Sequence, residues 1–281
     1  MKRKSIDELA KDPRFISGIY NYCDRWCERC SFSDRCLNYA IEKESDDGDD
    51  ASRDLRNEKF WKKLEETFRE TIEMVRADAK QRGINLDDSN LKAEVLAQER
   101  AERRLATKNL PIARAAMAYA RTIRKWFEES QPAFRAKGLE LETLARIEVG
   151  NPKAEAIQLA EFVEVIRWYQ HFIYVKLCRA IESKASEELE TDEELNSFPK
   201  DSDGSAKIAL IAMDRSIAAW SGLRLALGES EDADDILDLL AQLAAIRGES
   251  EKLFPNARAF VRPGFDSRSD VKGKTESLRK A

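Results

Sequence analysis

The sequence predicts an all-α protein, an antiparallel helical bundle of about five long helices with a small N-terminal four-cysteine metal-binding unit. Glycine and proline are scarce, at 11 and 7 of 281 residues, which is about half the usual share. Several long segments carry apolar residues at helical spacing. No segment alternates apolar and polar residues over six positions with β-branched enrichment, so a sheet of three or more strands is not expected.

Composition also narrows the possible partners and the compartment. The 48 basic and 53 acidic residues give a net charge of −5, which argues against nucleic acid as a partner. No run of 18 apolar residues occurs, so no membrane span is expected. The first residues, MKRKSIDELAKD, lack the apolar core of a secretory signal. We therefore expect a cytoplasmic protein whose partner is an unknown protein or small molecule.

The chain divides into five segments by composition. They are a cysteine-rich metal-binding unit at 1–41, an acidic linker at 42–56, the helical bundle at 57–253, an extended segment packed on the bundle at 254–266, and a disordered tail at 267–281. The linker contains the run EKESDDGDD, which is typical of a solvated connection.

The first half of the bundle is predicted from helical periodicity and from helix-ending residues. A helix begins near Asn57 and ends near Gly83, and its apolar face is formed by Trp61, Leu64, Phe68, Ile72, Val75 and Ala79. A charged second tract follows the N-cap cluster at 87–89 and is interrupted by Pro111. Two further helices are expected, with these bounds: 112–127 and 139–149.

The second half contains the two most apolar helices. The helix at 152–187 follows a Gly-Asn-Pro turn and is apolar on nearly all sides, as expected for a helix buried in the centre of a protein. After an acidic loop at 188–204, the helix at 206–227 is capped by Ser205, ended by Gly228 and rich in alanine. A last helix covers 231–247. Because the first two lack a polar face, we expect them to be neighbours in the core.

Four cysteines close together indicate metal chemistry. Cys23, Cys27, Cys30 and Cys36 have the spacing C-x3-C-x2-C-x5-C. Thiolates repel one another unless a cation or cluster lies between them, so the spacing favours zinc or a [4Fe-4S] cluster. Disulfides or a thiol redox relay are the third alternative. The C-x3-C-x2-C start also matches the radical SAM motif, but the alternating strands and helices of that barrel are absent from the pattern.

Three stretches of this sequence resemble a group of uncharacterised bacterial proteins. They are YNYCDRWCERC, DGSAKIALIAMDRSIAAW and FPNARAFVRPGFD. The resemblance covers most of the chain. It implies a bacterial cytoplasmic protein with an N-terminal four-cysteine motif, and it carries no known activity.

A second candidate site consists of polar residues in the two apolar helices. Glu164 and the only histidine, His171, share a face of one helix, and Lys207 and Asp214 share a face of the next. Buried charges are costly unless paired, so each carboxylate should lie near an Arg, a Lys or His171. The four residues form either a structural network or a polar pocket that binds a ligand.

Other metal and catalytic motifs are incomplete. A di-iron site needs two Glu-x-x-His pairs, and the chain has one histidine, preceded at the third position by Trp168. The DSDGS run at 201–205 lacks the later calcium ligands of an EF-hand loop. Cys178 is expected to be a small core residue.

From these patterns we expect a metal-binding helical protein whose four-cysteine site serves binding, interaction or redox sensing. The alternative is an iron–sulfur or ligand-binding enzyme that uses the polar pocket between the central helices. The sequence does not name a reaction.

Overall fold

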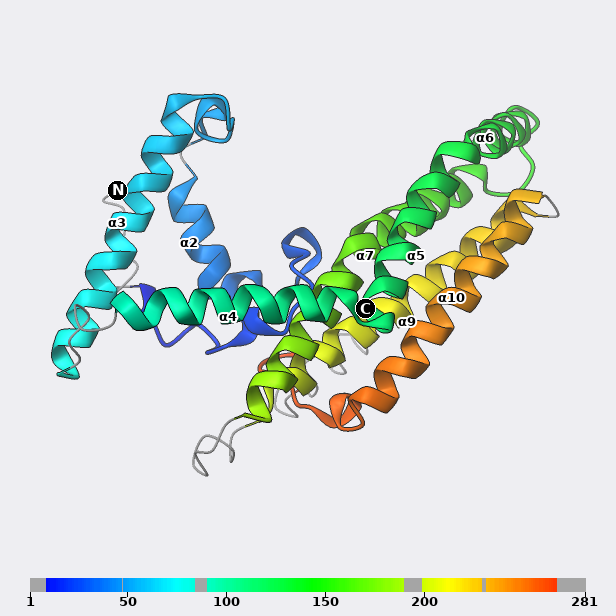
Figure 1. Ribbon diagram of the computed structural model, residues 1–281. Coiled ribbons are helices and arrows are strands. Elements are labelled where there is room, and N and C mark those ends of the chain that lie inside the picture. Colours follow the sequence, from blue (N-terminus) through cyan, green and yellow to red (C-terminus); the bar gives the residue numbers. More distant parts are fainter. Residues whose placement is uncertain (1–8, 47, 84–89, 190–198, 229–230, 267–281) are drawn as a thin grey trace. The chain divides into compact units, whose positions relative to one another are not determined.

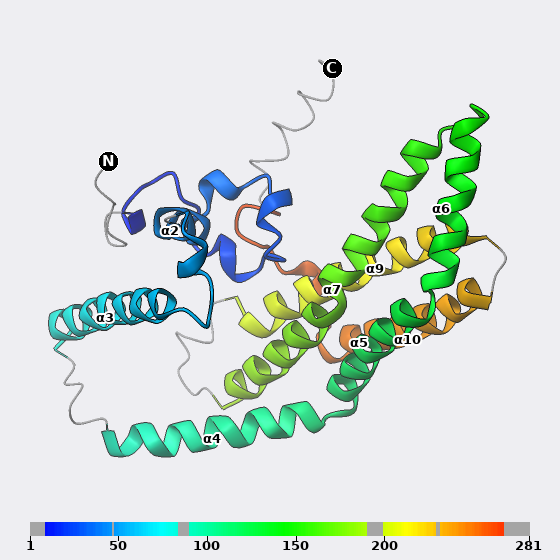
Figure 2. The ribbon, with the colours of Figure 1, turned by 90° about the horizontal axis from the view of Figure 1, so that it is seen from above.

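The protein is described from a computed structural model (Figures 1 and 2). The described residues are 9–46, 48–83, 90–189, 199–228 and 231–266. Every regular element in these ranges is an α-helix or a short 3-10 helix, which confirms the predicted all-α class. None of the helices in these ranges is both long and apolar enough to cross a membrane.

The chain divides into two compact units. The first contains residues 1–20 and 25–102, and the second contains residues 21–24 and 103–281. The short segment Asn21–Asp24 therefore belongs to the second unit, although the chain on both sides of it belongs to the first.

The first unit starts with short turns and continues into helices. Its elements are the 3-10 helices η2 (Cys27–Arg29), η3 (Ser33–Arg35) and η4 (Asp50–Ser52), the helices α2 (Leu37–Ser45) and α3 (Glu58–Gln81), and the first part of α4 (Asn90–Asn109). Helix α2 continues across position 42, where the acidic linker was predicted to begin. Part of that predicted linker is therefore helical.

Helix α3 begins and ends close to the predicted positions because both signals are local. The side chain of Asn57 accepts a hydrogen bond from the backbone N–H of Lys59 at 3.0 Å, which satisfies one free donor of the first turn. Gly83 follows the helix with a φ of 70°, a conformation that glycine adopts without steric cost. The N-cap cluster predicted at 87–89 lies outside the described residues.

The second unit is built on four long helices. They are α5 (Pro111–Glu129), α7 (Pro152–Glu187), α9 (Asp201–Leu227) and α10 (Glu231–Leu253). The most extensive contact joins α7 to α9, and further contacts join α9 to α10, α10 to α5 and α5 to α7. Figure 1 shows these helices side by side, with α7 in green, α9 in yellow and α10 in orange. A shorter helix, α6 (Gln131–Arg146), packs mainly on α7.

The core of this unit is aromatic, and it confirms that the two most apolar helices are neighbours. Trp220 of α9 is fully buried and makes an edge-to-face contact with Trp126 of α5, with 4.9 Å between the ring centroids. The indole N–H of Trp220 donates a hydrogen bond to the hydroxyl of Tyr119 at 2.9 Å. Ile166 and Tyr169 of α7 are also buried.

Helix α7 is not buried on all sides as predicted. Ile157 and Val175 are exposed, whereas Ile166, Ile173 and Leu177 are buried. Helical periodicity explains the difference: the buried residues recur at spacings of seven and four, which is one face of a helix. The sequence pattern therefore overstated how much of this helix faces the core.

Several helix ends differ from the prediction. Helix α6 begins at Gln131 instead of 139, and α10 continues to Leu253 instead of ending at 247. Helix α9 begins at Asp201, five residues before the predicted start, so Ser205 lies buried inside the helix and is not its cap. The Glu187 carboxylate takes that role, since it accepts hydrogen bonds from the N–H and the hydroxyl of Ser202 at 2.9 and 2.6 Å.

The segment after α10 packs on the second unit but is not extended throughout. It contains a 3-10 helix, η6 (Ala257–Ala259), that contacts α9. Phe254 and Ala257 are buried. The tail predicted at 267–281 lies outside the described residues.

Candidate functional site

Three of the four clustered cysteines lie among the short turns of the first unit. Cys27 begins η2, Cys30 follows it directly, and Cys36 lies between η3 and α2. The backbone N–H of Phe32 donates a hydrogen bond to the Sγ atom of Cys30 at 3.4 Å. Hydrogen bonds to metal ligands orient the ligands and tune their charge, so this contact suits a thiolate that holds a cation.

Cys36 occupies the N-terminal end of α2. It is the N-cap residue of this nine-residue helix, and its carbonyl accepts the first helical hydrogen bond from Ala40. The start of α2 therefore fixes the backbone of Cys36, one of the four candidate ligands.

Cys23 lies in the segment Asn21–Asp24, between two residues that attach this segment to the helices of the second unit. On one side, the Tyr22 hydroxyl donates a hydrogen bond to the Asp201 carboxylate at 3.0 Å. The Tyr22 ring makes an edge-to-face contact with Phe260, with 4.7 Å between the centroids. Burial and the nearby charge of Asp201 raise the pKa of Tyr22 to about 12.

On the other side of Cys23, Asp24 connects to α7 and α9. Its carboxylate accepts hydrogen bonds from the Tyr169 hydroxyl at 2.7 Å and from the Arg215 guanidinium at 2.6 Å. Its carbonyl accepts one from the indole N–H of Trp168 at 3.0 Å. Burial, followed by the hydrogen bond to Asp24, raises the pKa of Tyr169. The backbone around Cys23 is therefore held on both sides.

Asp201, the first residue of α9, connects the docked segment, Asn21–Asp24, to α7. Its carboxylate accepts hydrogen bonds from Arg179 at 2.9 Å and from Ser183 at 2.7 Å, in addition to the one from Tyr22. Burial acts to raise the pKa of Asp201, but these hydrogen bonds outweigh it and lower that pKa below its usual value. The carboxylate is thus kept in its charged form.

These anchoring residues could not be identified from the sequence. Asp24 and Tyr169 are 145 residues apart, and Tyr22 and Asp201 are 179 apart. No periodicity or motif connects such positions. The one available signal was the presence of polar residues on both sides of Cys23.

No metal centre is assembled in the described part of the chain. Across those residues, no group of three or more His, Cys, Asp or Glu side chains is placed to hold a metal ion. All five cysteines are described, and none of them forms a disulfide. Cys178 is half-buried on α7, and burial raises its pKa.

The second candidate site is not gathered into one cavity. Asp214 pairs with Arg247 of α10 at 3.2 Å and with Arg258, which follows α10. Glu164 and His171 are exposed on α7. The prediction that Asp214 lies near a cation is confirmed, but the cations come from the C-terminal elements. All three side chains of this cluster are roughly two-fifths exposed, so it resembles a surface ion-pair network.

Lys207 holds the C-terminal segment. Its Nζ atom donates a hydrogen bond to the carbonyl of Phe260 and forms an ion pair with Asp266 at 2.8 Å. Asp266 also accepts hydrogen bonds from Arg262 at 3.0 and 3.1 Å. Burial acts to raise the pKa of Asp266, but the bonds from Arg262 and Lys207 outweigh it and hold that pKa far below its usual value. These contacts occupy Lys207, which was predicted to bind a ligand.

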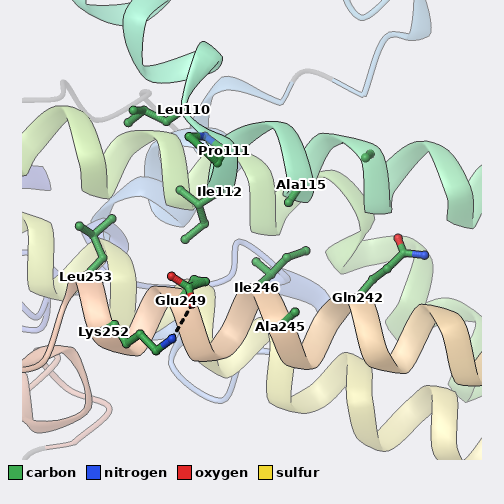
Figure 3. A pocket seen from close by; sticks show the side chains of 11 residues that line it. Leu110, Pro111, Ile112, Ala115, Gln242, Ala245, Ile246, Glu249, Lys252 and Leu253 are labelled. Atoms are coloured by element: carbon green, nitrogen blue, oxygen red, sulfur yellow. Dashed lines mark hydrogen bonds and ion pairs between the residues drawn. The ribbon is translucent and has the colours of Figure 1, made fainter.

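The surface of the second unit contains a groove between α5 and α10, with a volume of about 780 Å³ (Figure 3). Its lining is mostly apolar and includes Leu110, Ile112, Ile246 and Leu253. At one position an ion pair joins Lys252 to Glu249 at 2.6 Å. None of the predicted ligand-binding residues lines this groove, so it differs in position and polarity from the predicted pocket.

Comparisons with protein-family models, with curated proteins and with solved structures give no match for this chain.

Proposed function

We propose that this chain is a metal-binding helical protein, and that Cys23, Cys27, Cys30 and Cys36 hold one zinc ion or one [4Fe-4S] cluster. The observation that carries the proposal is the density of thiols, four within 14 residues at the spacing C-x3-C-x2-C-x5-C. Such a group is stable in its reduced, deprotonated form when a cation lies between the sulfurs.

Two local features support thiolate ligands. Cys30 already accepts an N–H hydrogen bond from Phe32, and Cys36 lies at the N-terminal end of α2. The hydrogen bond orients the Cys30 sulfur, as is usual for metal ligands, and the helix start fixes the backbone of Cys36. A third feature concerns Cys23, whose backbone is held by Tyr22 and Asp24. A ligand on a held backbone loses less conformational freedom when it binds.

The role that fits these features is a binding or redox-sensing module. A four-thiolate zinc site stabilises a small unit with little core of its own. A cluster at the same thiolates would also respond to oxidants through its redox state. Both versions need cysteines that stay reduced, so the proposal includes a reducing compartment such as the bacterial cytoplasm. The proposal also includes an N-terminal unit that holds the metal. It further includes a partner, which is an unknown protein or small molecule.

Metal analysis of the full chain distinguishes the two ligands. The protein is purified without oxygen, and its zinc, iron and acid-labile sulfide are measured together with its absorbance. We expect either one zinc in a colourless protein, or four irons with absorbance near roughly 400 nm, as for clusters ligated by cysteine thiolates. A purified chain without either metal contradicts the proposal.

Matched cysteine variants test the ligand assignment. Cys27→Ser and Cys30→Ser should lose the metal, because serine is a poor replacement for a thiolate ligand. Cys178→Ser removes a thiol outside the group and should keep the full metal content. Circular dichroism should show the helices retained in all three variants. Stoichiometric metal in Cys27→Ser would rule out the four-cysteine assignment.

A further inference from the structure

Helix α3 carries a continuous stripe of exposed apolar side chains. The exposed fractions are 55% for Trp61, 58% for Phe68, 49% for Ile72 and 53% for Val75. These residues lie on one face of a helix of 24 residues. Contiguous exposed apolar surface of this kind usually marks an interaction site.

The stripe is formed before any partner binds. Asn57 caps the start of α3. The indole N–H of Trp61 donates a hydrogen bond to the carbonyl of Leu55 at 2.9 Å, which fixes the orientation of the ring. A partner would therefore meet an ordered surface, and less conformational entropy is lost on binding.

The spacing of the stripe suits a straight, long contact. From Trp61 to Val75 the apolar positions follow one another at intervals of 3, 4, 4 and 3 residues, with half-buried Leu64 between Trp61 and Phe68. Ala79, the next position at this spacing, is buried and lies outside the stripe. Intervals of 3, 4 and 4 residues add up to 11 residues over three turns, or about 3.7 residues per turn. This is close to the repeat of a straight helix, about 3.6 residues per turn, so the apolar positions stay on one side of a nearly straight helix. A second helix can then lie along the whole stripe.

The charges beside the stripe are divided between its two halves. Helical spacing places Glu58, Glu65, Arg69 and Arg76 along one edge of the apolar face. The acidic pair lies in the N-terminal half of this edge, and the basic pair lies in the C-terminal half. A second copy of α3 that runs in the opposite direction brings its basic half to the acidic half of the first. A copy that runs in the same direction brings this edge against the opposite edge of the partner, which carries Thr67 and Thr71 and offers no opposite charges at these positions.

The apolar positions are also self-complementary in the reversed direction. Phe68 lies midway between Trp61 and Val75 in the sequence. A two-fold axis near Phe68 then places Trp61 against the partner's Val75 and repeats the same contact by symmetry. Such an interface uses one surface on both copies, which is the commonest arrangement in soluble dimers.

We propose that α3 is the surface through which two copies of this chain associate as an antiparallel pair of helices. The stripe supplies the apolar seam of this dimer. The reversed edges supply the opposite charges, with Glu65 near the partner's Arg69 and Glu58 near the partner's Arg76.

Sedimentation of the full chain over a range of concentrations tests the proposal. The wild-type chain should be a dimer that dissociates on dilution. Phe68→Glu places a charge in the middle of the seam and should give a monomer with unchanged helix content. Leu225→Glu alters an apolar residue on α9 that is also exposed, and this variant should remain dimeric. A wild-type chain that is monomeric at every concentration, or a Phe68→Glu variant that stays dimeric, overturns the proposal.

A charge exchange tests the antiparallel direction. Glu65→Arg replaces attraction to the partner's Arg69 by repulsion in both symmetric positions, and it should weaken the dimer about tenfold. The double variant Glu65→Arg with Arg69→Glu restores opposite charges only between reversed helices, so it should recover most of the wild-type affinity. A double variant as weak as Glu65→Arg alone contradicts the antiparallel pairing.

Discussion

The substitution Gly204→Ala should loosen the segment that holds Cys23. Gly204 lies in the first turns of α9, directly beneath the Tyr22 ring. A Cβ atom at this position would press into that ring and would lie 2.8 Å from Cζ of Phe260. The ring cannot move away freely, because the Tyr22 hydroxyl is bonded to Asp201.

Three effects determine the size of the change. Alanine is favoured over glycine inside a helix by about 0.5–1 kcal/mol. If Tyr22 stays in place, the extra methyl group costs about 1–3 kcal/mol of overpacking. If Tyr22 leaves, its hydrogen bond to a charged acceptor is lost, at about 1.5–3 kcal/mol. The steric cost equals or exceeds the helical gain in either case, so the net destabilisation should be about 0–2.5 kcal/mol.

Two other glycines provide matched controls. Gly138 in α6 and Gly248 in α10 have open space around the position of a Cβ atom. Alanine at either position should stabilise the protein by about 0.5–1 kcal/mol. Urea unfolding gives the global free energy, and hydrogen exchange of the peptide that contains 21–24 reports local release. A Gly204→Ala variant that is stabilised like Gly138→Ala, with unchanged exchange at 21–24, would refute the docking geometry.

Three further substitutions test individual contacts. Tyr22→Phe should remove one tyrosine that titrates near pH 12 in an ultraviolet titration. The raised pKa means that folding favours the protonated hydroxyl. In the wild type, the attachment of the segment Asn21–Asp24 should therefore be stable below about pH 10 and weaken towards pH 12. Asp266→Asn should weaken the contact with Lys207 by about 1–3 kcal/mol, and limited proteolysis after α10 measures the loosening. Because the pKa of Asp266 is lowered, the wild-type contact should weaken only as the pH falls well below about 4. Equal cleavage of the two proteins at neutral pH would contradict this. Tyr119→Phe leaves the buried indole N–H of Trp220 without its acceptor and should lower the unfolding free energy by about 1–3 kcal/mol; an unchanged urea midpoint would show that this bond contributes nothing.

Much of the fold could be predicted because its signals are local. The start of α3 at Asn57, the Asn151–Pro152 start of α7 and the end of α9 at Gly228 all depend on a few neighbouring residues. The pairing of α7 with α9 followed from their shared lack of a polar face. The start of α9 was misplaced because its cap is the carboxylate of Glu187, a side chain 15 residues from Ser202. A motif search along the chain does not detect a cap supplied from another helix.

The candidate site shows the same division between local and distant information. The four cysteines are visible in the sequence because their spacing is short. The residues that hold Cys23 are not, since Tyr169, Asp201 and Arg215 reach the docked segment only when α7 and α9 pack together. Likewise, periodicity predicted the apolar face of α3, but not that this face stays exposed. Periodicity shows which side chains share a face, and only tertiary packing decides what that face meets.

The sequence by itself determined the helical class, most of the helix positions and the thiol cluster, because caps, breakers and apolar spacing act over one or two turns. Only the tertiary structure decided that Asp214 pairs with arginines of the C-terminal elements, that Lys207 holds Asp266, and that the segment around Cys23 is attached to the helices. A charged side chain takes whichever partner the packed helices bring within about 3 Å. That choice depends on contacts between positions far apart in the chain, and no local pattern encodes it.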